Sequence, residues 1–198
     1  MCNLYRLNAP AAEIAHVFAA DLEQSSNAGG EVYPGYPGLV LAGGKLITMV
    51  WGFPLQRRGK TGQLLKPKPI NNTRDDKLDS PFWRASFTSR RCLIPMQAFA
   101  EAEGDKGSKT RTWISIPDTD VFTCAGLWRD SAEWGSSYSL MMTDANDEMN
   151  TVHDRMPVII GAADRDRWLA ASPEEARKLC KPYAKPLIIE QTSQGWSG

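Results

Sequence analysis

One residue near the start of the chain could react with a carbonyl compound. Cys2 directly follows Met1 in "MCNLY", and because cysteine is small we expect Met1 to be removed. The freed residue would carry an α-amine beside a thiol. An α-amine has an ordinary pKa of about 7.7–8, so part of it is unprotonated and nucleophilic near neutral pH. It can condense with an aldehyde, and the neighbouring thiol can then close a five-membered thiazolidine ring, which proximity favours.

The simpler interpretation of "MC" alone is that Cys2 packs as a small hydrophobic residue. The other cysteines, Cys92, Cys124 and Cys180, are scattered through apolar stretches with no C-x-x-C pair. Their spacing predicts neither a zinc site nor a redox dithiol, and we expect buried, inert thiols. No cofactor and no metal are expected.

Three further side chains could assist such chemistry. Glu101, in "AFAEAEG", follows an apolar run, and a buried carboxyl has a raised pKa and can transfer protons; an edge-strand glutamate is the alternative. His153, in "TVHDRMP", could be a general acid or base with its ordinary pKa of about 6.5, or a hydrogen-bonding core residue. Asn72, in "INNTR", offers an amide to a substrate oxygen, although asparagine is common in loops.

The elements that must position these residues are mostly strands. "CNLYRL" predicts a short strand, and residues 9–23 predict a surface helix with an apolar stripe of Ile14, Val17, Phe18 and Leu22 and with His16 facing solvent. Residues 31–53 predict strands broken by Pro-Gly turns, with Gly43-Gly44 at a hairpin tip.

The rest of the chain follows a similar pattern. The polar, Pro- and Gly-punctuated stretch from 54 to 81 predicts a long basic loop. Residues 91–116 predict two strands around "EGDKG", and "VFTCAGLW" and "SYSLMMT" predict two more. A short helix capped by Asp144 is expected before His153, followed by a strand at "MPVII" and by helices at "AADRDRWLAA" and "SPEEARKLC", the latter capped by its serine.

Length and composition predict one domain. The chain has 198 residues, of which 42% are hydrophobic and 23% charged, enough for one sizeable core. We expect an α+β fold, with a mostly antiparallel, barrel-like β-sheet core flanked by short helices, because no βαβ rhythm is present. The single domain would span 1–198, with a basic loop inserted at 55–80 and a C-terminal helix and tail at 171–198. Neither a signal peptide nor a membrane span is predicted, so we expect a cytoplasmic, nucleoid-associated monomer.

The charge distribution is uneven. The formal net charge is zero, but the segment from Arg57 to Arg111 carries 13 Lys or Arg and 6 Asp or Glu, a net charge of +7. A basic segment in acidic surroundings can steer a polyanion, because local potential matters more than the total. A solvated loop is the alternative.

Together these stretches resemble the SOS-response-associated peptidase (SRAP) family, whose members shield abasic sites in single-stranded DNA by crosslinking to them. The matching pieces are "MCNLY", "MVWGFPL", "INNTR", "RRCLIPMQAFAEAEG", "FTCAGLW" and "LMMTDANDEMNTVHDRMPVII", in order from residue 1 to about residue 170. Each piece is weak alone, and their order and spacing make the combination specific.

The resemblance implies roles for individual residues. Cys2 would be the nucleophile after Met1 removal, Asn72 would orient it and the substrate, Glu101 would deprotonate the α-amine and shuttle protons, and His153 would donate a proton to the sugar oxygen. The residues implied to contact phosphates are Arg74, Thr143 and Arg155, with Arg84, Arg90 and Arg91 as helpers.

Two positions depart from the family pattern. Asn3-Leu4 stands where many relatives have Gly-Arg, and Ala102 follows Glu101 where a tryptophan is common. A stacking role for Trp83 could replace that tryptophan, since aromatic faces hold unpaired bases without sequence preference; a core role is the alternative.

The expected partner is single-stranded DNA containing abasic sites, bound through its phosphates because a lesion without a base offers no base edge to read. The expected enzyme modifies itself by crosslinking, and the crosslink could be reversible. An autopeptidase step that removes Met1 or a lyase-type activity is expected as a further activity. Two alternatives stay open. One is a cysteine peptidase that uses Cys2, His153 and Glu101, and the other is a non-catalytic single-strand-binding module that uses the basic loop.

Overall fold

The computed structural model describes residues 2–23 and 30–196. The strands, in chain order, are β1 (Leu4–Leu7), β2 (Asp21–Leu22), β3 (Gly30–Val32), β4 (Pro37–Ala42), β5 (Lys45–Trp51), β6 (Phe53–Arg58), β7 (Leu64–Ile70), β8 (Asn72–Arg74), β9 (Arg91–Met96), β10 (Ala98–Glu103), β11 (Thr110–Ser115), β12 (Phe122–Ser131), β13 (Gly135–Asp144), β14 (Arg155–Pro157), β15 (Ile159–Ile160) and β16 (Ile188–Gly195). The α-helices are α1 (Ala11–Val17), α2 (Pro81–Ser89), α3 (Arg165–Ala170) and α4 (Pro173–Arg177), and 3-10 helices lie at Asp75–Lys77, Met149–Thr151 and Ala162–Asp164.

Five strands of the larger sheet close into a ring. Strand β4 pairs with β5 and β9, β9 with β12, and β12 with β13, all antiparallel. A parallel pairing of β13 with β5, at Ser137↔Val50 and Tyr138↔Trp51, completes the circuit. The expected α+β class with a mostly antiparallel, barrel-like core and short flanking helices is confirmed.

Alternation along these strands separates two cores. One set of side chains points into the ring and forms an interior cluster that includes Val40, Trp51 and Leu140. The alternate set, such as Leu41 and Leu93, packs outside against the helices. This alternation is the expected behaviour of strands whose two faces are both buried, because successive side chains point to opposite faces.

A pair of buried tyrosines fills the ring. The hydroxyls of Tyr5 and Tyr138 are 2.5 Å apart, and the Trp51 ring stacks on Tyr138 and meets Tyr5 edge-on. Gly38 permits this contact, because a Cβ there would lie 2.1 Å from the Tyr138 hydroxyl and 2.2 Å from the Tyr5 hydroxyl.

A second sheet has the strand order β16-β11-β10-β1-β3. The sequence 91–116 forms three strands instead of the expected two, because the chain passes from β9 in the ring to β10 in the second sheet at Gln97. That residue bonds to the end of β1, with its backbone N–H donating to Arg6 O at 2.9 Å and its side-chain oxygen accepting from Asn8 N–H at 2.7 Å.

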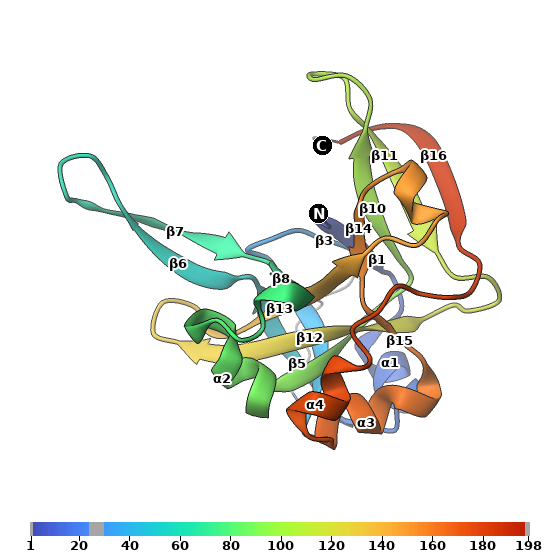
Figure 1. Cartoon of the computed structure of the whole chain (residues 1–198), viewed down its shortest axis with the longest axis horizontal. Helices are drawn as coiled ribbons and strands as arrows, with labels where there is room; N and C mark the ends of the chain where they lie inside the picture. The colour runs from blue at the N-terminus through green and yellow to red at the C-terminus, as the bar shows by residue number, and fades with distance from the viewer. Residues whose placement is uncertain (1, 24–29, 197–198) are drawn as a thin grey trace.

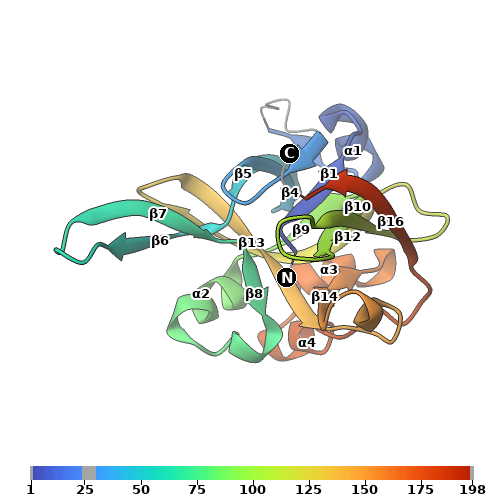
Figure 2. The ribbon, with the colours of Figure 1, turned by 90° about the horizontal axis from the view of Figure 1, so that it is seen from above.

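The prediction of a long basic loop at 55–80 is wrong. Strands β6 and β7 form a two-stranded ribbon, followed by β8, a 3-10 turn and α2. Figure 1 and Figure 2 show this ribbon extending away from the body of the molecule. Proline is tolerated in β7 because both strands of an isolated ribbon are edge strands, where an N–H is not required on the outer side. The expected C-terminal tail is likewise ordered at its end, where β16 pairs with β11.

The other local predictions have mixed outcomes. The β1 strand, the Gly43-Gly44 hairpin and the Ser172 cap, which accepts from Glu175 N–H at 3.3 Å, are confirmed. The first helix is shorter than expected: it ends at Val17, which is 55% exposed, although His16 faces solvent as expected.

Asp144 is not the expected helix cap. It ends strand β13, and the Asn146 side chain accepts from Met149 N–H at 2.8 Å instead. Among the described residues no helix has the length and apolar character needed to cross a bilayer.

Candidate functional site

Cys2 lies at the entrance of β1 and is completely buried. Its side chain belongs to the interior cluster of the ring, and the thiol donates to Leu4 O at 3.4 Å. Burial raises the pKa of the Cys2 thiol far above its ordinary value, and the nearby Glu101 carboxylate raises it further. The thiol is therefore protonated at neutral pH while residue 2 remains buried.

Two consecutive asparagine amides hold the backbone of Cys2. Asn71 Nδ2 donates to Cys2 O at 3.0 Å, and Asn72 Nδ2 donates to the same oxygen at 2.8 Å. Asn71 also donates to Asn3 Oδ1 at 3.0 Å, and its carbonyl accepts from Trp51 Nε1 at 3.0 Å. These bonds fix the start of the chain against the junction of β7 and β8.

Asn72 begins β8, which pairs in parallel with β13 at Leu140↔Asn72. Its Oδ1 is buried and has no hydrogen-bond partner in the part of the chain that the structure describes. A buried amide oxygen without a partner is costly, and such atoms often mark a site that a ligand completes. Asn71 was missed by the sequence analysis; the adjacent pair in "INNTR" was the available signal.

Glu101 sits on β10, and the antiparallel register Leu4↔Ala100 brings it beside the segment that precedes β1. The residue is 5% exposed, and burial, with a smaller contribution from the Asp154 carboxylate, raises the pKa of Glu101 to about 7. A carboxyl that titrates near neutral pH can both accept and return a proton. The Asp154 effect also shows that the segment containing His153 lies within electrostatic range of Glu101.

His153 lies between the 3-10 turn at Met149–Thr151 and β14. Its Nδ1 is 3.0 Å from Arg155 N and 2.8 Å from Asp154 Oδ1. Nδ1 accepts from the Arg155 N–H only when it carries no proton, and it donates to Asp154 only when it carries one, so the two contacts exclude each other. Burial lowers the pKa of His153, so the ring is neutral near pH 7. The hydrogen bond from the Arg155 N–H then assigns the ring proton to Nε2.

Three residues predicted to contact phosphates already interact with carboxylates. Thr143 Oγ1 donates to Asp75 Oδ2 at 3.0 Å, and Arg155 Nη1 lies 3.4 Å from Asp75 Oδ1 and 3.2 Å from Asp144 Oδ1. Arg74 donates twice to Asp76, each time at 2.9 Å. Register on β13 places Arg74 opposite Met142 and Arg155 opposite Asp144, so these side chains gather at one end of β13.

The three helper arginines differ in their surroundings. Arg84 on α2 is exposed and has no ion pair within the described residues, and Arg90 has a buried Nε without a hydrogen-bond partner there. Arg91 is a correction. It is 7% exposed, and its guanidinium donates to the carbonyl oxygens of Phe87, Trp168 and Ala171, so it ties α2 to α3 and cannot reach a phosphate.

The proposed stacking role of Trp83 is also wrong. The ring is buried at 7% exposure and packs against Phe53 and Phe82, whose rings carry the Arg129 guanidinium at 4.2 Å and 4.4 Å from their centroids. The alternative, a core role for Trp83, is correct. Trp83 belongs to the apolar face of α2, which packs against the outer face of the ring of strands.

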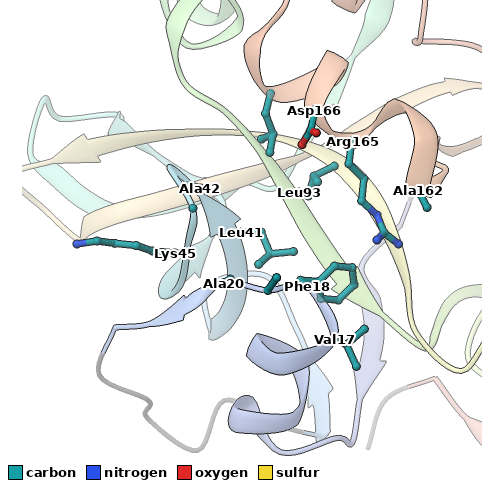
Figure 3. Close-up of a pocket in the computed structure, with 13 residues that line it drawn as sticks. Val17, Phe18, Ala20, Leu41, Ala42, Lys45, Leu93, Ala162, Arg165 and Asp166 are labelled. Atoms are coloured by element: carbon teal, nitrogen blue, oxygen red, sulfur yellow. The ribbon is translucent and has the colours of Figure 1, made fainter.

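A surface pocket elsewhere on the molecule has no relation to these residues. It has a volume of about 470 Å³ and lies between α1, β4, β5 and α3, with Leu41, Leu93 and Phe18 in its wall (Figure 3). The Arg165 guanidinium lies over the Phe18 ring at 4.6 Å. None of the predicted site residues lines this pocket.

No group of three or more His, Cys, Asp or Glu side chains able to hold a metal ion is present among residues 2–23 and 30–196. Cys92 and Cys124 are buried thiols, as expected, and Cys180 is partly buried.

Solved structures share this architecture. A protein from Bacteroides thetaiotaomicron superposes with a TM-score of 0.80 at 19% identity, covering 96% of this chain and 91% of the other. A protein from Bordetella bronchiseptica also gives a TM-score of 0.80, at 24% identity, covering 96% and 99%. At these identities the likeness establishes the fold.

Curated relatives are named as abasic site processing proteins. YoqW of Bacillus subtilis is 29% identical over 149 residues, which is 70% of this chain and 65% of YoqW. HMCES of Xenopus tropicalis is 29% identical over 140 residues, which is 57% of this chain and 42% of HMCES. The match thus spans slightly less than two thirds of the length of YoqW and under half of that of HMCES.

The family model described as SOS response associated peptidase (SRAP) matches residues 1–194. That match covers nearly the whole sequence, including Cys2, the Asn71-Asn72 pair, Glu101 and His153. The chain therefore belongs to the SRAP family.

Proposed function

We propose that this protein crosslinks itself to abasic sites in single-stranded DNA through Cys2, once Met1 has been removed. The observation that carries the proposal is the placement of Cys2: two asparagine amides hold its carbonyl oxygen, and a buried carboxyl with a pKa of about 7 lies beside it. Membership of the SRAP family and the names of the curated relatives support the same substrate.

The proposed reaction joins the protein to the open-chain sugar in two steps. The α-amine of Cys2 attacks the C1 aldehyde, and loss of one water leaves an imine. The thiol sulfur then adds to the imine carbon, the thiol proton moves to the nitrogen, and a thiazolidine results. One water is the only product released, and no oxidant or reductant is consumed.

The neighbouring residues have proton-transfer roles in this proposal. Glu101 accepts a proton from the α-ammonium and returns one to the leaving hydroxyl, which suits a carboxyl that titrates near neutral pH. His153, neutral with its proton on Nε2, donates to the sugar ring oxygen and promotes ring opening. Run in reverse, with one water taken up and the protons returned through Glu101, the same steps hydrolyse the thiazolidine and release the DNA with its aldehyde restored. A lyase-type activity would be a separate β-elimination from the imine.

DNA contacts are proposed for the residues that gather at the end of β13 and on α2. Arg74, Thr143 and Arg155 would hold phosphates near the lesion, with Arg84 and Arg90 as further contacts. Monomeric single-strand binding and association with the nucleoid are part of the same proposal.

The peptidase alternative is less well supported by the chemistry of Cys2. A peptidase needs a thiolate, and burial raises the pKa of this thiol well above its ordinary value. An unprotonated α-amine is the better first nucleophile here. Removal of Met1, by the protein itself or by a methionine aminopeptidase, is the one cleavage that the proposal requires.

The test is crosslinking to a single-stranded oligonucleotide with one abasic site, followed by a denaturing gel. Intact mass first establishes that Met1 is absent, and the adduct should have the summed mass of protein and DNA less one water. We expect Cys2→Ala to form no heat-stable adduct, and Cys180→Ala, which changes a thiol outside the site, to match the unaltered protein.

A borohydride control separates the two chemical steps. Cys2→Ala keeps an α-amine but lacks the thiol, so it should be trapped on the abasic strand only when the imine is reduced by borohydride. A heat-stable adduct of Cys2→Ala without reduction, or no adduct of the processed natural protein, contradicts the proposal.

A further inference from the structure

The β6–β7 ribbon carries positive charge that nothing in the described molecule neutralises. Between Phe53 and Asn72 the sequence contains Arg57, Arg58, Lys60, Lys66 and Lys68 and no Asp or Glu. Within residues 2–23 and 30–196, none of these five cations forms an ion pair. The ribbon is therefore an arm with five uncompensated charges, directed away from the body (Figure 1).

The cations lie on both faces of the ribbon. Cross-strand partners share a face, so the pairs Leu55↔Lys68 and Arg57↔Leu65 place Arg57 and Lys68 together. The next pair, Arg58↔Leu64, points to the opposite face. Lys66 points to that same face as Arg58, because it is the neighbour of Leu65 in the strand and successive side chains alternate between faces. The register shift between Leu55 and Arg57 adds a residue to β7 and leaves the alternation of β6 intact.

The root of the ribbon is fixed while its outer part is exposed. Phe53 is fully buried against Trp83, and Gly52, with φ of +117°, lets Pro69 pack where a Cβ would lie 2.4 Å from the Pro69 Cβ. A strand of six residues reaches roughly 20 Å from such a root. The arm can thus contact a partner well away from Cys2 without loosening the site.

We propose that the β6–β7 ribbon lies in the major groove of duplex DNA that adjoins the strand on which Cys2 acts. The proposal rests on the proposed function in taking DNA as the partner. The major groove is about 12 Å wide and admits a two-stranded β-ribbon. Both of its walls are lined by phosphates, which matches cations on both faces, whereas a single strand or a bilayer surface would meet one face only.

The test compares the salt dependence of binding to a short intact duplex and to the single strand of the same length. Each phosphate contact contributes about 0.9 to the slope of log K against log salt on duplex DNA. We expect R57Q/K68Q and R58Q/K66Q each to lower the duplex slope by about 2, and the fourfold variant by about 4, with little change for the single strand.

Two controls accompany these variants. K181Q/K185Q removes two exposed charges elsewhere and should leave both slopes unchanged. Arg58 Nη1 also donates to Gly62 O at 3.0 Å, so Arg58→Lys, which keeps the charge and loses that bond, should retain the duplex slope.

Three results would overturn the inference: an equal fall for duplex and single strand, a fall for one face only, or no fall. The outcome is separable from that of the proposed function. Crosslinking to a short single-stranded abasic oligonucleotide does not involve the ribbon, so the ribbon variants should crosslink normally; a protein that never crosslinks would refute the proposed function and leave the duplex titration decisive for the ribbon.

Discussion

The hydroxyl of Thr143 donates a hydrogen bond to Asp75 Oδ2 at 3.0 Å, in a position where the family resemblance implies a phosphate contact. The other Asp75 oxygen lies 3.4 Å from Arg155 Nη1. The Asp75 carboxylate thus interacts with both Thr143 and Arg155, the two side chains that could hold a DNA phosphate here. A phosphate that binds there must compete with Asp75.

The first prediction follows from that competition. Asp75→Asn keeps the shape and an acceptor oxygen but removes one negative charge, so we expect binding of single-stranded DNA to tighten by about 3- to 10-fold at low salt, with the gain shrinking as salt rises. Fluorescence anisotropy titrations at several salt concentrations measure this. Asp166→Asn makes the same charge change on the exposed side of α3 and serves as the control; equal gains for both variants would show a general charge effect.

The second prediction concerns the amides that hold Cys2. Removing a hydrogen bond to a positioned group costs on the order of 1 kcal/mol, so Asn72→Ala and Asn71→Ala should each slow crosslinking by roughly 5- to 10-fold. The rate is measured by quenching samples of the abasic-strand reaction on denaturing gels. Binding to intact single-stranded DNA should be unchanged, and a loss of binding equal to the loss of rate would mean that these residues hold DNA and not Cys2.

The third prediction concerns pH and Glu101. Burial raises the folded-state pKa to about 7, above the ordinary value near 4.5, so the folded protein binds a proton that the unfolded chain has released. That contribution to stability is complete below the unfolded pKa and is lost as pH rises towards 7.

We therefore expect the unaltered protein to lose about 2 to 3 kcal/mol between pH 5 and pH 8 relative to Glu101→Gln, which has no such proton. Urea unfolding of both proteins at the two pH values gives the difference. Parallel stability profiles would show that Glu101 does not titrate in this range. The comparison also cancels His153, whose lowered pKa makes stability rise with pH in both proteins.

The fourth prediction separates a structural arginine from a surface one. Arg91 donates to carbonyls of α2 and α3, and lysine cannot reproduce its fork of donors, so Arg91→Lys should lower the free energy of unfolding by about 2 to 4 kcal/mol without changing the DNA affinity of the folded protein. Arg84→Gln should do the reverse, weakening DNA binding while stability stays within about 0.5 kcal/mol. Urea unfolding and anisotropy on both variants check the contrast, and weaker binding by folded Arg91→Lys would restore the phosphate role.

Much of the sheet could be predicted because alternation and turn residues are local signals. The Gly43-Gly44 hairpin needs two consecutive residues with positive φ, and two consecutive glycines in the sequence indicate such a turn directly. The β6–β7 ribbon was mistaken for a loop because its prolines and lysines are unfavourable in a sheet interior, and nothing local reveals that both strands are edges. The division of 91–103 between two sheets is likewise a tertiary feature, since the apolar run continues through Gln97.

The site was predictable to the extent that its chemistry is distinctive. Cys2, Asn72 and Glu101 come together through pairings of β1 with β10 and of β8 with β13, which join residues far apart in the sequence. Asn71 was missed because its signal in the sequence is the adjacent pair in "INNTR", and that pair does not reveal a contact with a backbone carbonyl. The burial of Arg91 depends on α3 folding over it, which charge counting cannot anticipate.

The passage of the chain from β9 to β10 has a consequence for motion. One unbroken stretch supplies β9 to the ring and β10 to the second sheet, and Gln97 between them is bonded to Arg6 and Asn8 at the end of β1. A hinge motion between the two sheets at this point would break these hydrogen bonds. The groups on β10 and β8 that flank residue 2 are thereby held at a set spacing. Association with a substrate then requires little reorganisation of the protein, and hydrogen exchange along β1 should be as slow as in the barrel strands.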